Sequence, residues 1–427
     1  MSGRVIVVGS VNIDLVARVP HLPHPGETVT GGTYERHHGG KGGNQAVAAA
    51  RLRRPTLFIG AVGDDTFEKE VRRALTTERV DVSMVASLPG QPTGMALILV
   101  DAQGENEIAV VPGANGAIET GFVRDCLARL GPLHADVMLV SNEVPLHVVR
   151  EALMCGHAAG AITVLNPAPA MGVDRSIFGL ADIVTPNRNE LAMLLATEAR
   201  RTGRRLDSAS TDAAVRARPL LEPGPEGPGV RKAVIVTLGA AGVVVLERVG
   251  SGLDGTVAGR LLGPDPNAGC GDVEEAPEPL PGGASSAIPA AATAIPAEPI
   301  AAVDVFPAPS FSSEPLPLPV VAAPPAPAPA PAPSPARTPA PEAPAGSIRI
   351  WEVPADKVQT VDSTGAGDAF CGALAAALAE GRPLAEAVRR AVAGSALATT
   401  HSGAREGMPT AAELDEFLAA QVGVGAG

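Results

Sequence analysis

A run of small residues followed by an aspartate, Gly365-Ala366-Gly367-Asp368, combines two groups that phosphoryl transfer requires. Small residues at the start of a helix let backbone N–H groups approach a phosphate, and the helix dipole favours negative charge there. Asp368 follows these donors directly, so its carboxylate could take a proton from an acceptor hydroxyl while the phosphoryl group moves. The alternative is a capped helix after a glycine turn, and the segment alone does not decide between the two.

Two further polar clusters contain residue types that bind a small hydroxylated ligand. Asn12 and Asp14 alternate with apolar residues, so in an extended segment both side chains lie on one face. The glycines around Lys41 and Asn44 would let the backbone pack closely on such a ligand, to which both side chains could donate hydrogen bonds. Turn formation is the alternative for the first cluster, and a flexible helix N-terminus is the alternative for the second.

The order of the apolar segments indicates an α/β fold beneath these clusters. Strand patterns such as 137–141 and 162–165 alternate with helical patterns, which predicts a doubly wound, mostly parallel sheet flanked by helices. Segments 94–100 and 107–111 have the pattern of a hairpin, and with 28–34 they do not follow this alternation. We expect these segments to form a small β-sheet lid over the carboxyl edge of the large sheet, where ligands bind in such folds.

Composition argues against two classes of function. The chain of 427 residues has a formal net charge of −13, whereas nucleic-acid binding demands a basic face. No apolar run approaches the ~20 residues of a membrane span, and the first residues lack the pattern of a signal peptide. Cys126, Cys155 and Cys371 lie in apolar surroundings, as reduced core cysteines do. We therefore expect a cytoplasmic protein that binds neither nucleic acid nor membranes.

The composition changes completely between residues 250 and 346. About half of the chain's 42 prolines lie there, in Ala/Pro repeats that favour extended polyproline II and cannot build a core. We expect this Pro/Ala-rich segment to be a disordered insertion at the tip of a hairpin formed by 243–247 and 348–353. The expected divisions are a catalytic domain at 1–249 and 347–422, with lid strands within about 11–45 and 93–113, and a tail at 423–427.

Seven short motifs follow one another along the chain, at residues 9–14, 25–28, 39–46, 112–115, 165–170, 185–190 and 362–370. In identity and order they closely resemble the PfkB family of carbohydrate kinases. They cover the chain except for the Pro/Ala-rich segment and the tail. The stretches Gly-Lys-Gly-Gly-Asn-Gln and Asn-Pro-Ala-Pro favour the branch of the family that phosphorylates ribose.

The resemblance implies ATP-dependent phosphorylation of D-ribose at its 5-hydroxyl. By similarity Asp368 is the catalytic base, and the backbone of Gly365, Ala366 and Gly367 forms the anion hole for the migrating phosphoryl group. The residues that resemble the family's ribose contacts, besides Asp368, are Asn12, Ile13, Asp14, Gly40, Lys41, Gly42, Gly43, Asn44 and Glu143. Those that resemble its ATP contacts are Asn187, Thr237, Leu238, Gly239, Ala240, Ala241, Gly242, Gly367 and Asp368.

The resemblance also implies two cations. Asn187 and Glu190 resemble an element that holds Mg²⁺, largely through water, although the two residues alone indicate a helix-capping pair. A monovalent cation, usually potassium (K⁺), is implied at a site of which Asp362 and Thr364 match one side. The second side would come, mostly through backbone carbonyls, from Ala398, His401, Gly403 and Gly407.

The segments around residues 28 and 94–111 resemble the family's lid, which also pairs two subunits, so the resemblance implies a homodimer. Two other functions stay open. One is a kinase of the same family for another sugar or a nucleoside, such as fructose, deoxyribose or adenosine. The other is a scaffold or sensor that docks a partner through the Pro/Ala-rich segment, although the intact catalytic motif argues against a purely structural role.

Overall fold

The computed structural model describes residues 3–202, 212–223, 227–253, 260–262 and 347–424. The predicted insertion at 250–346 and the predicted tail at 423–427 lie for the most part outside these ranges. Within them, no helix is both long and apolar enough to cross a membrane.

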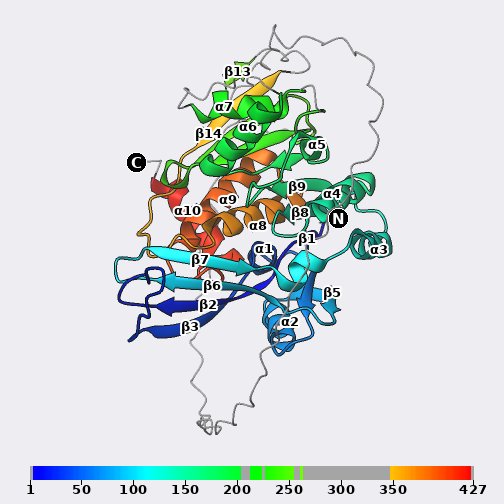
Figure 1. Ribbon diagram of the computed structural model, residues 1–427. Helices are drawn as coiled ribbons and strands as arrows, with labels where there is room; N and C mark the ends of the chain where they lie inside the picture. The colour runs from blue at the N-terminus through cyan, green and yellow to red at the C-terminus, as the bar shows by residue number, and fades with distance from the viewer. Residues whose placement is uncertain (1–2, 203–211, 224–226, 254–259, 263–346, 425–427) are drawn as a thin grey trace, which may run out of the picture. The chain divides into compact units, whose positions relative to one another are not determined.

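A large sheet forms the centre of the fold (Figure 1), and the described residues place ten strands in it, in the order β13-β14-β12-β11-β10-β9-β8-β1-β4-β5. Neighbouring strands run parallel from β5 to β11, and β11, β12, β14 and β13 pair antiparallel. The bounds are β1 (Val5–Val8), β4 (Thr56–Gly63), β5 (Val80–Leu88), β8 (Val137–Ser141), β9 (Ile162–Asn166), β10 (Ile183–Val184), β11 (Ala233–Thr237), β12 (Val243–Arg248), β13 (Arg260–Leu262) and β14 (Ile348–Val353). The predicted doubly wound, mostly parallel sheet is confirmed.

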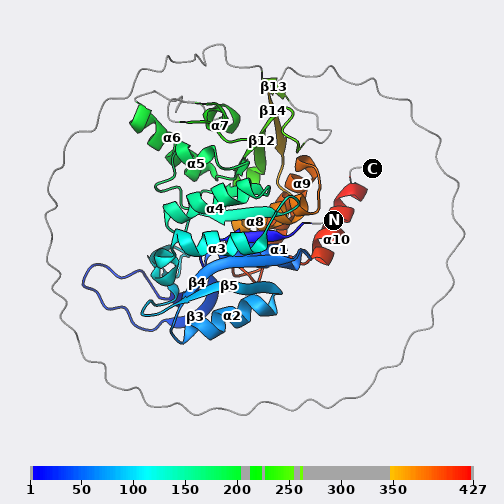
Figure 2. The same ribbon diagram turned by 90° about the vertical axis from the view of Figure 1, so that its right-hand side faces the viewer.

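Helices cover both faces of this sheet (Figure 2), because its central strands are apolar on both sides. In β1, Val5 and Val7 belong to one buried cluster, whereas Ile6 and Val8 belong to the other. The first cluster includes residues of α1 (Lys41–Arg51), α2 (Phe67–Thr77), α8 (Ala366–Ala379), α9 (Leu384–Ala398) and α10 (Ala411–Val424). The second includes residues of α3 (Thr120–Leu130), α4 (Leu146–Ala158), α5 (Arg175–Phe178), α6 (Arg188–Thr202) and α7 (Ala213–Leu221).

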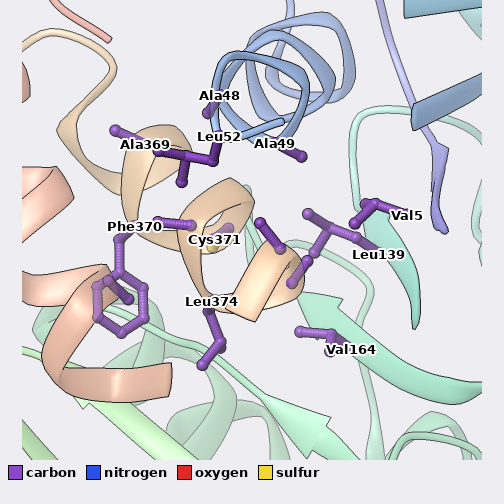
Figure 3. Packing of buried hydrophobic residues seen from close by; sticks show 14 of the residues in the cluster. Val5, Ala48, Ala49, Leu52, Leu139, Val164, Ala369, Phe370, Cys371 and Leu374 are labelled. Atoms are coloured by element: carbon purple, nitrogen blue, oxygen red, sulfur yellow. The ribbon is translucent and has the colours of Figure 1, made fainter. Parts of the chain in front are cut away.

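Helix α8 is almost entirely buried, which explains its run of alanines. Figure 3 shows Ala369, Phe370, Cys371 and Leu374 of α8 among side chains of α1 and of the sheet strands. A Cβ on Gly372 would lie 2.5 Å from the Cβ of Ala48, so glycine permits α1 and α8 to approach closely. This packing fixes the first turn of α8, and therefore Asp368, against the sheet.

A second, small sheet contains β2 (Asn12–Arg18), β3 (Thr33–Gly39), β6 (Gly94–Val100) and β7 (Asn106–Val111), in the order β3-β2-β6-β7. The predicted hairpin of β6 and β7 is confirmed, since the two strands pair antiparallel. The prediction of a strand at 28–34 was wrong by several residues. The strand is β3, because Gly31 with its positive φ of 89° interrupts the extended chain and β3 pairs with β2 up to Gly39.

The predicted hairpin across the Pro/Ala-rich segment is also confirmed, since β12 and β14 pair antiparallel from Val243 with Val353 to Arg248 with Ile348. However, β13 pairs with β14 in turn, so regular structure continues past residue 250, the predicted start of the insertion. The alternation of strands and helices was also incomplete in the prediction, because β5 and α3 were not identified.

Candidate active site

The carboxyl ends of the parallel strands bring the predicted residues to one edge of the large sheet. A short connection leads from β1 to Asn12, from β8 to Glu143 and from β10 to Asn187. A cleft at this edge joins the glycine cluster, the predicted nucleotide turn and the start of α8. Its lining residues are Lys41, Asn166, Ala168, Thr185, Asn187, Glu190, Thr237, Ser363, Gly365, Gly367, Asp368 and Cys371.

The start of α8 has the form of an anion site. Gly365 caps the helix in the left-handed conformation, with φ of 75°. A Cβ there would come within 2.7 Å of the Ala404 carbonyl oxygen, so this position requires glycine. The position that a Cβ would take on Gly367, by contrast, is free of described atoms within 4 Å. Both glycines line the cleft, and the first N–H groups of a helix have no acceptor within it. In the described part of the chain Gly365 N and Gly367 N donate to no acceptor, so an anion can bind them, whereas Ala366 N donates to the Ser363 carbonyl at 3.2 Å and would have to exchange this bond to join them.

Asp368 lies in the first turn of α8 with only 6% of its surface exposed, and two amide side chains hold its carboxylate. Asn44 Nδ2 donates to Oδ2 at 3.0 Å, and Gln45 Nε2 donates to Oδ1 at 3.1 Å. Burial raises the pKa of Asp368, while the Lys41 charge and the Asn44 hydrogen bond oppose this increase. The Asp368 charge in turn raises the pKa of Lys41. A carboxylate with a raised pKa in the wall of a cleft is suited to accept a proton from a hydroxyl.

Glu143 connects the loop after β8 with the glycine cluster. Its Oε2 accepts hydrogen bonds from the backbone N–H of Lys41 at 2.9 Å and from the hydroxyl of Ser10. Gly40, which precedes α1, has φ of 82°, and a Cβ there would meet the backbone of Val11 at 2.6 Å. Glycine is therefore required at this position for the chain to turn into α1 beside β2.

Strand β2 presents Asn12 and Asp14 as the alternation predicted. The Ile13 side chain between them is fully buried in the core, so only the backbone of this predicted sugar contact could reach a ligand. Asn12 Oδ1 accepts a hydrogen bond from Asn115 Nδ2 at 2.8 Å. Burial raises the pKa of Asp14 to about 6, against the opposing charge of Arg405. Its Oδ1 is buried and accepts no hydrogen bond from the described part of the chain.

Close packing requires glycine at positions 42 and 43, in addition to their predicted contact with a ligand. A Cβ on Gly42 would lie 2.8 Å from the backbone of Gly9, and one on Gly43 would lie 2.4 Å from Arg405 Nη2. These two glycines therefore let α1 approach β1 and leave room for a buried arginine. Their contact with a ligand stays a prediction.

The predicted nucleotide turn follows β11 and adjoins the start of α6. Leu238 N donates to the Gly242 carbonyl at 2.8 Å, which closes the turn around the 3-10 segment Gly239–Ala241. Thr237 forms a bridge with Asn187 and lines the cleft. Residues 239–241 are exposed, so their backbone is available to a nucleotide.

Asn187 and Glu190 form the capping pair that the two residues alone indicated. Asn187 N and Nδ2 donate to the Glu190 carboxylate, both at 2.8 Å, and Glu190 N donates to Asn187 Oδ1 at 2.9 Å. Burial raises the pKa of Glu190. Both side chains also line the cleft, and such oxygen atoms fit the preference of Mg²⁺ for water and carboxylate ligands.

The two halves of the predicted potassium site lie side by side. Asp362 Oδ2 accepts from Gly403 N at 2.9 Å, and Oδ1 accepts from the N–H and hydroxyl of Thr364 at 2.8 and 2.7 Å. Burial raises the pKa of Asp362, but these hydrogen bonds together lower the pKa by more than burial raises it. The pKa of Asp362 is therefore below that of an ordinary aspartate. A Cβ on Gly407 would lie 2.2 Å from the Ala398 carbonyl oxygen, so these two predicted ligand residues lie close together.

The donor set predicted for potassium consists mainly of backbone carbonyls. The His401 side chain is exposed and its Nδ1 lies 3.0 Å from the Thr400 hydroxyl, so only its backbone fits the predicted role. Over the described ranges, no group of three or more His, Cys, Asp and Glu side chains could hold a metal ion. Carbonyl oxygens with one carboxylate fit a large monovalent cation better than a transition metal.

Several residues of the site were not identified from the sequence. Ser10 donates to Glu143, Asn115 donates to Asn12, Gln45 donates to Asp368 and to Asn166, and Arg405 donates to Asn44. All except Arg405 lie within the seven short sequence motifs, so their motifs already indicated them. No local pattern marks Arg405.

A buried carboxylate beside a glycine-rich helix start, at the carboxyl edge of a doubly wound sheet, is the arrangement of an α/β phosphotransferase site. The sequence matches the profile of the pfkB family carbohydrate kinases over residues 2–255 and 349–411. The chain belongs to this family, and it is therefore a phosphotransferase with an alcohol group as acceptor.

Individual relatives agree with this assignment. The chain is 36% identical over 248 residues to the ribokinase of Haemophilus influenzae, which covers 58% of this chain and 76% of that protein. It is 36% identical over 247 residues to the ribokinase of Schizosaccharomyces pombe, covering 56% and 73% of the two chains. The crystal structure of ribokinase from Thermotoga maritima superposes with a TM-score of 0.65 at 26% identity, covering 97% of this chain and 99% of that one.

Proposed function

We propose that the protein transfers the γ-phosphoryl group of ATP to the 5-hydroxyl of D-ribose, giving D-ribose 5-phosphate and ADP. The observation that carries this proposal is the buried Asp368 carboxylate, which two amides orient beside the open start of α8. The similarity to ribokinases supports ribose as the acceptor.

In the proposed reaction Asp368 accepts the proton of the 5-hydroxyl while that oxygen attacks the γ-phosphorus. The bond from phosphorus to the ADP oxygen breaks, and the N–H groups at Gly365–Gly367 donate to the phosphoryl oxygens as charge develops on them. The Lys41 ammonium lies near the same carboxylate and can neutralise part of that charge. Asn12, Asp14, Asn44 and Glu143 are the proposed contacts that hold the sugar hydroxyls.

The two predicted cations fit residues of this chain. Asn187 and Glu190 would hold Mg²⁺ through water, and Mg²⁺ neutralises phosphate charge during such transfers. Asp362 and the carbonyls of the 398–407 segment would hold potassium next to the turn that leads into Gly365. Turnover should therefore rise when potassium replaces a large organic cation in the buffer, and an equal rate in both buffers would argue against this site.

The test of the proposed substrate is an ADP-release assay with ribose, deoxyribose, fructose and adenosine as acceptors. We expect the highest kcat/KM with ribose, and ³¹P–¹H correlation NMR of the product should place phosphorus on the oxygen at C5. A higher kcat/KM with another acceptor would favour the second candidate, a family member for a different sugar or nucleoside.

We propose that the catalytic domain is active without the Pro/Ala-rich segment. Leu262 pairs with Ile348 and Val249 N donates to the Ser347 carbonyl at 2.9 Å, so the chain ends on either side of residues 263–346 are close together. Replacing 263–346 by a short Gly/Ser linker should leave kcat and KM nearly unchanged. Lost or altered turnover would revive a scaffold or sensor role.

We also propose a homodimer formed through the small sheet. On β7, the side chains of Ile108 and Val110 lie on one face of this sheet and are more than half exposed. The exposed Tyr34 on β3 and Leu97 on β6 lie on the opposite face. Exposed apolar side chains on a small sheet are typical of an interface. Light scattering should give twice the mass of the chain, and Ile108→Lys should lower it, whereas a monomeric wild-type protein would contradict the proposal. A cytoplasmic location belongs to the proposal as well, and cell fractionation tests it.

A further inference from the structure

Arg405 is a buried charged residue, behind the acceptor side of the cleft, that the proposed chemistry does not use. It lies in the segment between α9 and α10, with 6% of its surface exposed. Its Nε donates to Asn44 Oδ1 at 2.9 Å, and its Nη2 donates to the Gly39 carbonyl at 2.9 Å. One side chain therefore connects the end of β3 and the first turn of α1 with a segment more than 350 residues away in the sequence.

These contacts fix which way the Asn44 amide faces. A guanidinium can only donate hydrogen bonds, so Asn44 must present its oxygen to Arg405. The NH₂ group of Asn44 then points the other way, where it donates to Asp368 Oδ2 at 3.0 Å. An ionised carboxylate can only accept hydrogen bonds, so Asp368 requires the same orientation of the Asn44 amide as Arg405 does. Without Arg405 the amide could turn and present its oxygen to the carboxylate.

The surroundings show that this place is built for an arginine. Gly43 leaves the room that Nη2 occupies, since a Cβ there would lie 2.4 Å away. Burial lowers the pKa of Arg405 to about 10, and the charge of Asp14 opposes that decrease, so Arg405 is a cation at neutral pH. Among the charges around Asp14, that of Arg405 most strongly opposes the increase that burial causes in the Asp14 pKa. The Arg405 charge also interacts with that of Asp368.

We propose that Arg405 is a positioning residue for the acceptor site, which acts through Asn44 to orient the donor that holds Asp368. This inference rests on the proposed function, because it assigns to Asp368 the role of base. Arg405 touches neither substrate nor the reacting atoms in this arrangement.

A purely structural role for Arg405 is the competing explanation, and the chain offers a matched control for it. Arg51 holds the backbone of the same segment from the other side, since its Nη1 donates to the carbonyls of Arg405 and Met408, both at 2.7 Å. It also forms an ion pair with Glu78 but makes no contact with Asn44 among its hydrogen bonds. Loosening the segment through Arg51→Met should therefore leave the Asn44 amide in place.

The test is a double-mutant cycle between Arg405→Met and Asn44→Ala, measured as kcat and KM for the sugar and for ATP. We expect each single variant to lower kcat/KM for the sugar about 100-fold with little change in KM for ATP, since small misplacements of reacting groups have effects of this size. The double variant should have about the same kcat/KM for the sugar as the more impaired single variant, because the second change removes a contact that is already lost. Arg51→Met should stay within about threefold of wild type.

Independent effects, which would bring the double variant to a loss of about 10⁴-fold, would overturn the proposal, since residues that do not interact show additive energies. An Arg51→Met variant as impaired as Arg405→Met would overturn it too. If thermal melting shows that Arg405→Met does not fold, Arg405→Gln decides, because glutamine keeps an amide donor that can hold Asn44 Oδ1. We then expect Arg405→Gln to retain most of kcat/KM for the sugar, and a loss as large as that of Asn44→Ala would overturn the proposal. The cycle uses whichever acceptor the wild-type protein phosphorylates best, so absent turnover of ribose refutes the substrate proposal without deciding the role of Arg405.

Discussion

The pKa of Asp14 predicts a pH dependence for sugar binding in the absence of nucleotide. Burial raises this pKa from 3.8 to about 6, and the charged groups that face the carboxylate are Arg405, Glu143, His37 and Asp368. An ionised carboxylate can accept hydrogen bonds from two sugar hydroxyls, whereas the protonated form loses part of this capacity. Affinity should therefore be constant above pH 7 and should fall as the pH decreases through 6.

The magnitude follows from a single titration. At pH 5, one unit below the pKa, about 10% of Asp14 is ionised, so the Kd for D-ribose should be up to about tenfold higher than at pH 8, or about 1.4 kcal/mol weaker, the full value applying when only the ionised form binds. An unshifted aspartate would still be mostly ionised at pH 5. Isothermal titration calorimetry between pH 5 and 8, without ATP, measures this directly.

The control variant is Asp14→Asn, which cannot titrate. It should bind ribose weakly and with the same Kd at pH 5 and pH 8. A wild-type Kd that does not change over this range would refute the reasoning. A tenfold change that persists in Asp14→Asn would assign the titration to another group, such as Asp368, and would refute it as well.

Three further changes test other parts of the structure. Gly43→Ala should displace the Arg405 guanidinium and raise KM for the sugar with little effect on KM for ATP, which steady-state kinetics can separate. Phe370→Ala should lower the free energy of unfolding by about 3–5 kcal/mol in urea titrations, because the ring is buried in the core, whereas the exposed Val361→Ala should change it by less than about 0.5 kcal/mol. Burial raises the pKa of the Cys371 thiol to about 12, so mass spectrometry should find Cys371 unmodified after iodoacetamide treatment of the folded protein at pH 8.

Much of the fold could be predicted because its signals are local. Short and almost entirely apolar runs such as 137–141 are typical of strands in a sheet that is covered on both faces, and alternation with helices predicts that this sheet is parallel. The pairing of β12 with β14 was predictable because both segments retain a strand pattern on either side of a segment that cannot continue it. Strand β3 was misplaced because its sequence, Thr33–Gly39, is rich in charged and histidine side chains that do not show the usual strand preference.

Some residues of the candidate site could likewise be predicted from their local sequence, and others could not. Asp368 and Asn44 lie at glycine-rich helix starts, where the local sequence already indicates a ligand site, whereas Glu143 was predicted only from the family resemblance. The hydrogen bonds that orient them depend on tertiary contacts, such as the one between Asn44 and Arg405, which nothing in either local sequence reveals. A buried arginine in a polar loop has the same sequence pattern as an exposed one, so its role becomes visible only in the folded chain.

The central claim is that Asp368 is the base of a sugar kinase, and Asp368→Asn tests it most directly. The variant keeps the shape of the side chain, and Gln45 can turn its unpartnered Oε1 toward the new NH₂ group, so the fold and the sugar site should persist. Turnover of ribose and ATP should fall by about 10²–10⁴-fold, the contribution typical of a general base, while calorimetry should give a Kd for ribose close to that of wild type. Turnover within a fewfold of wild type in this variant would contradict the assignment of Asp368 as the base.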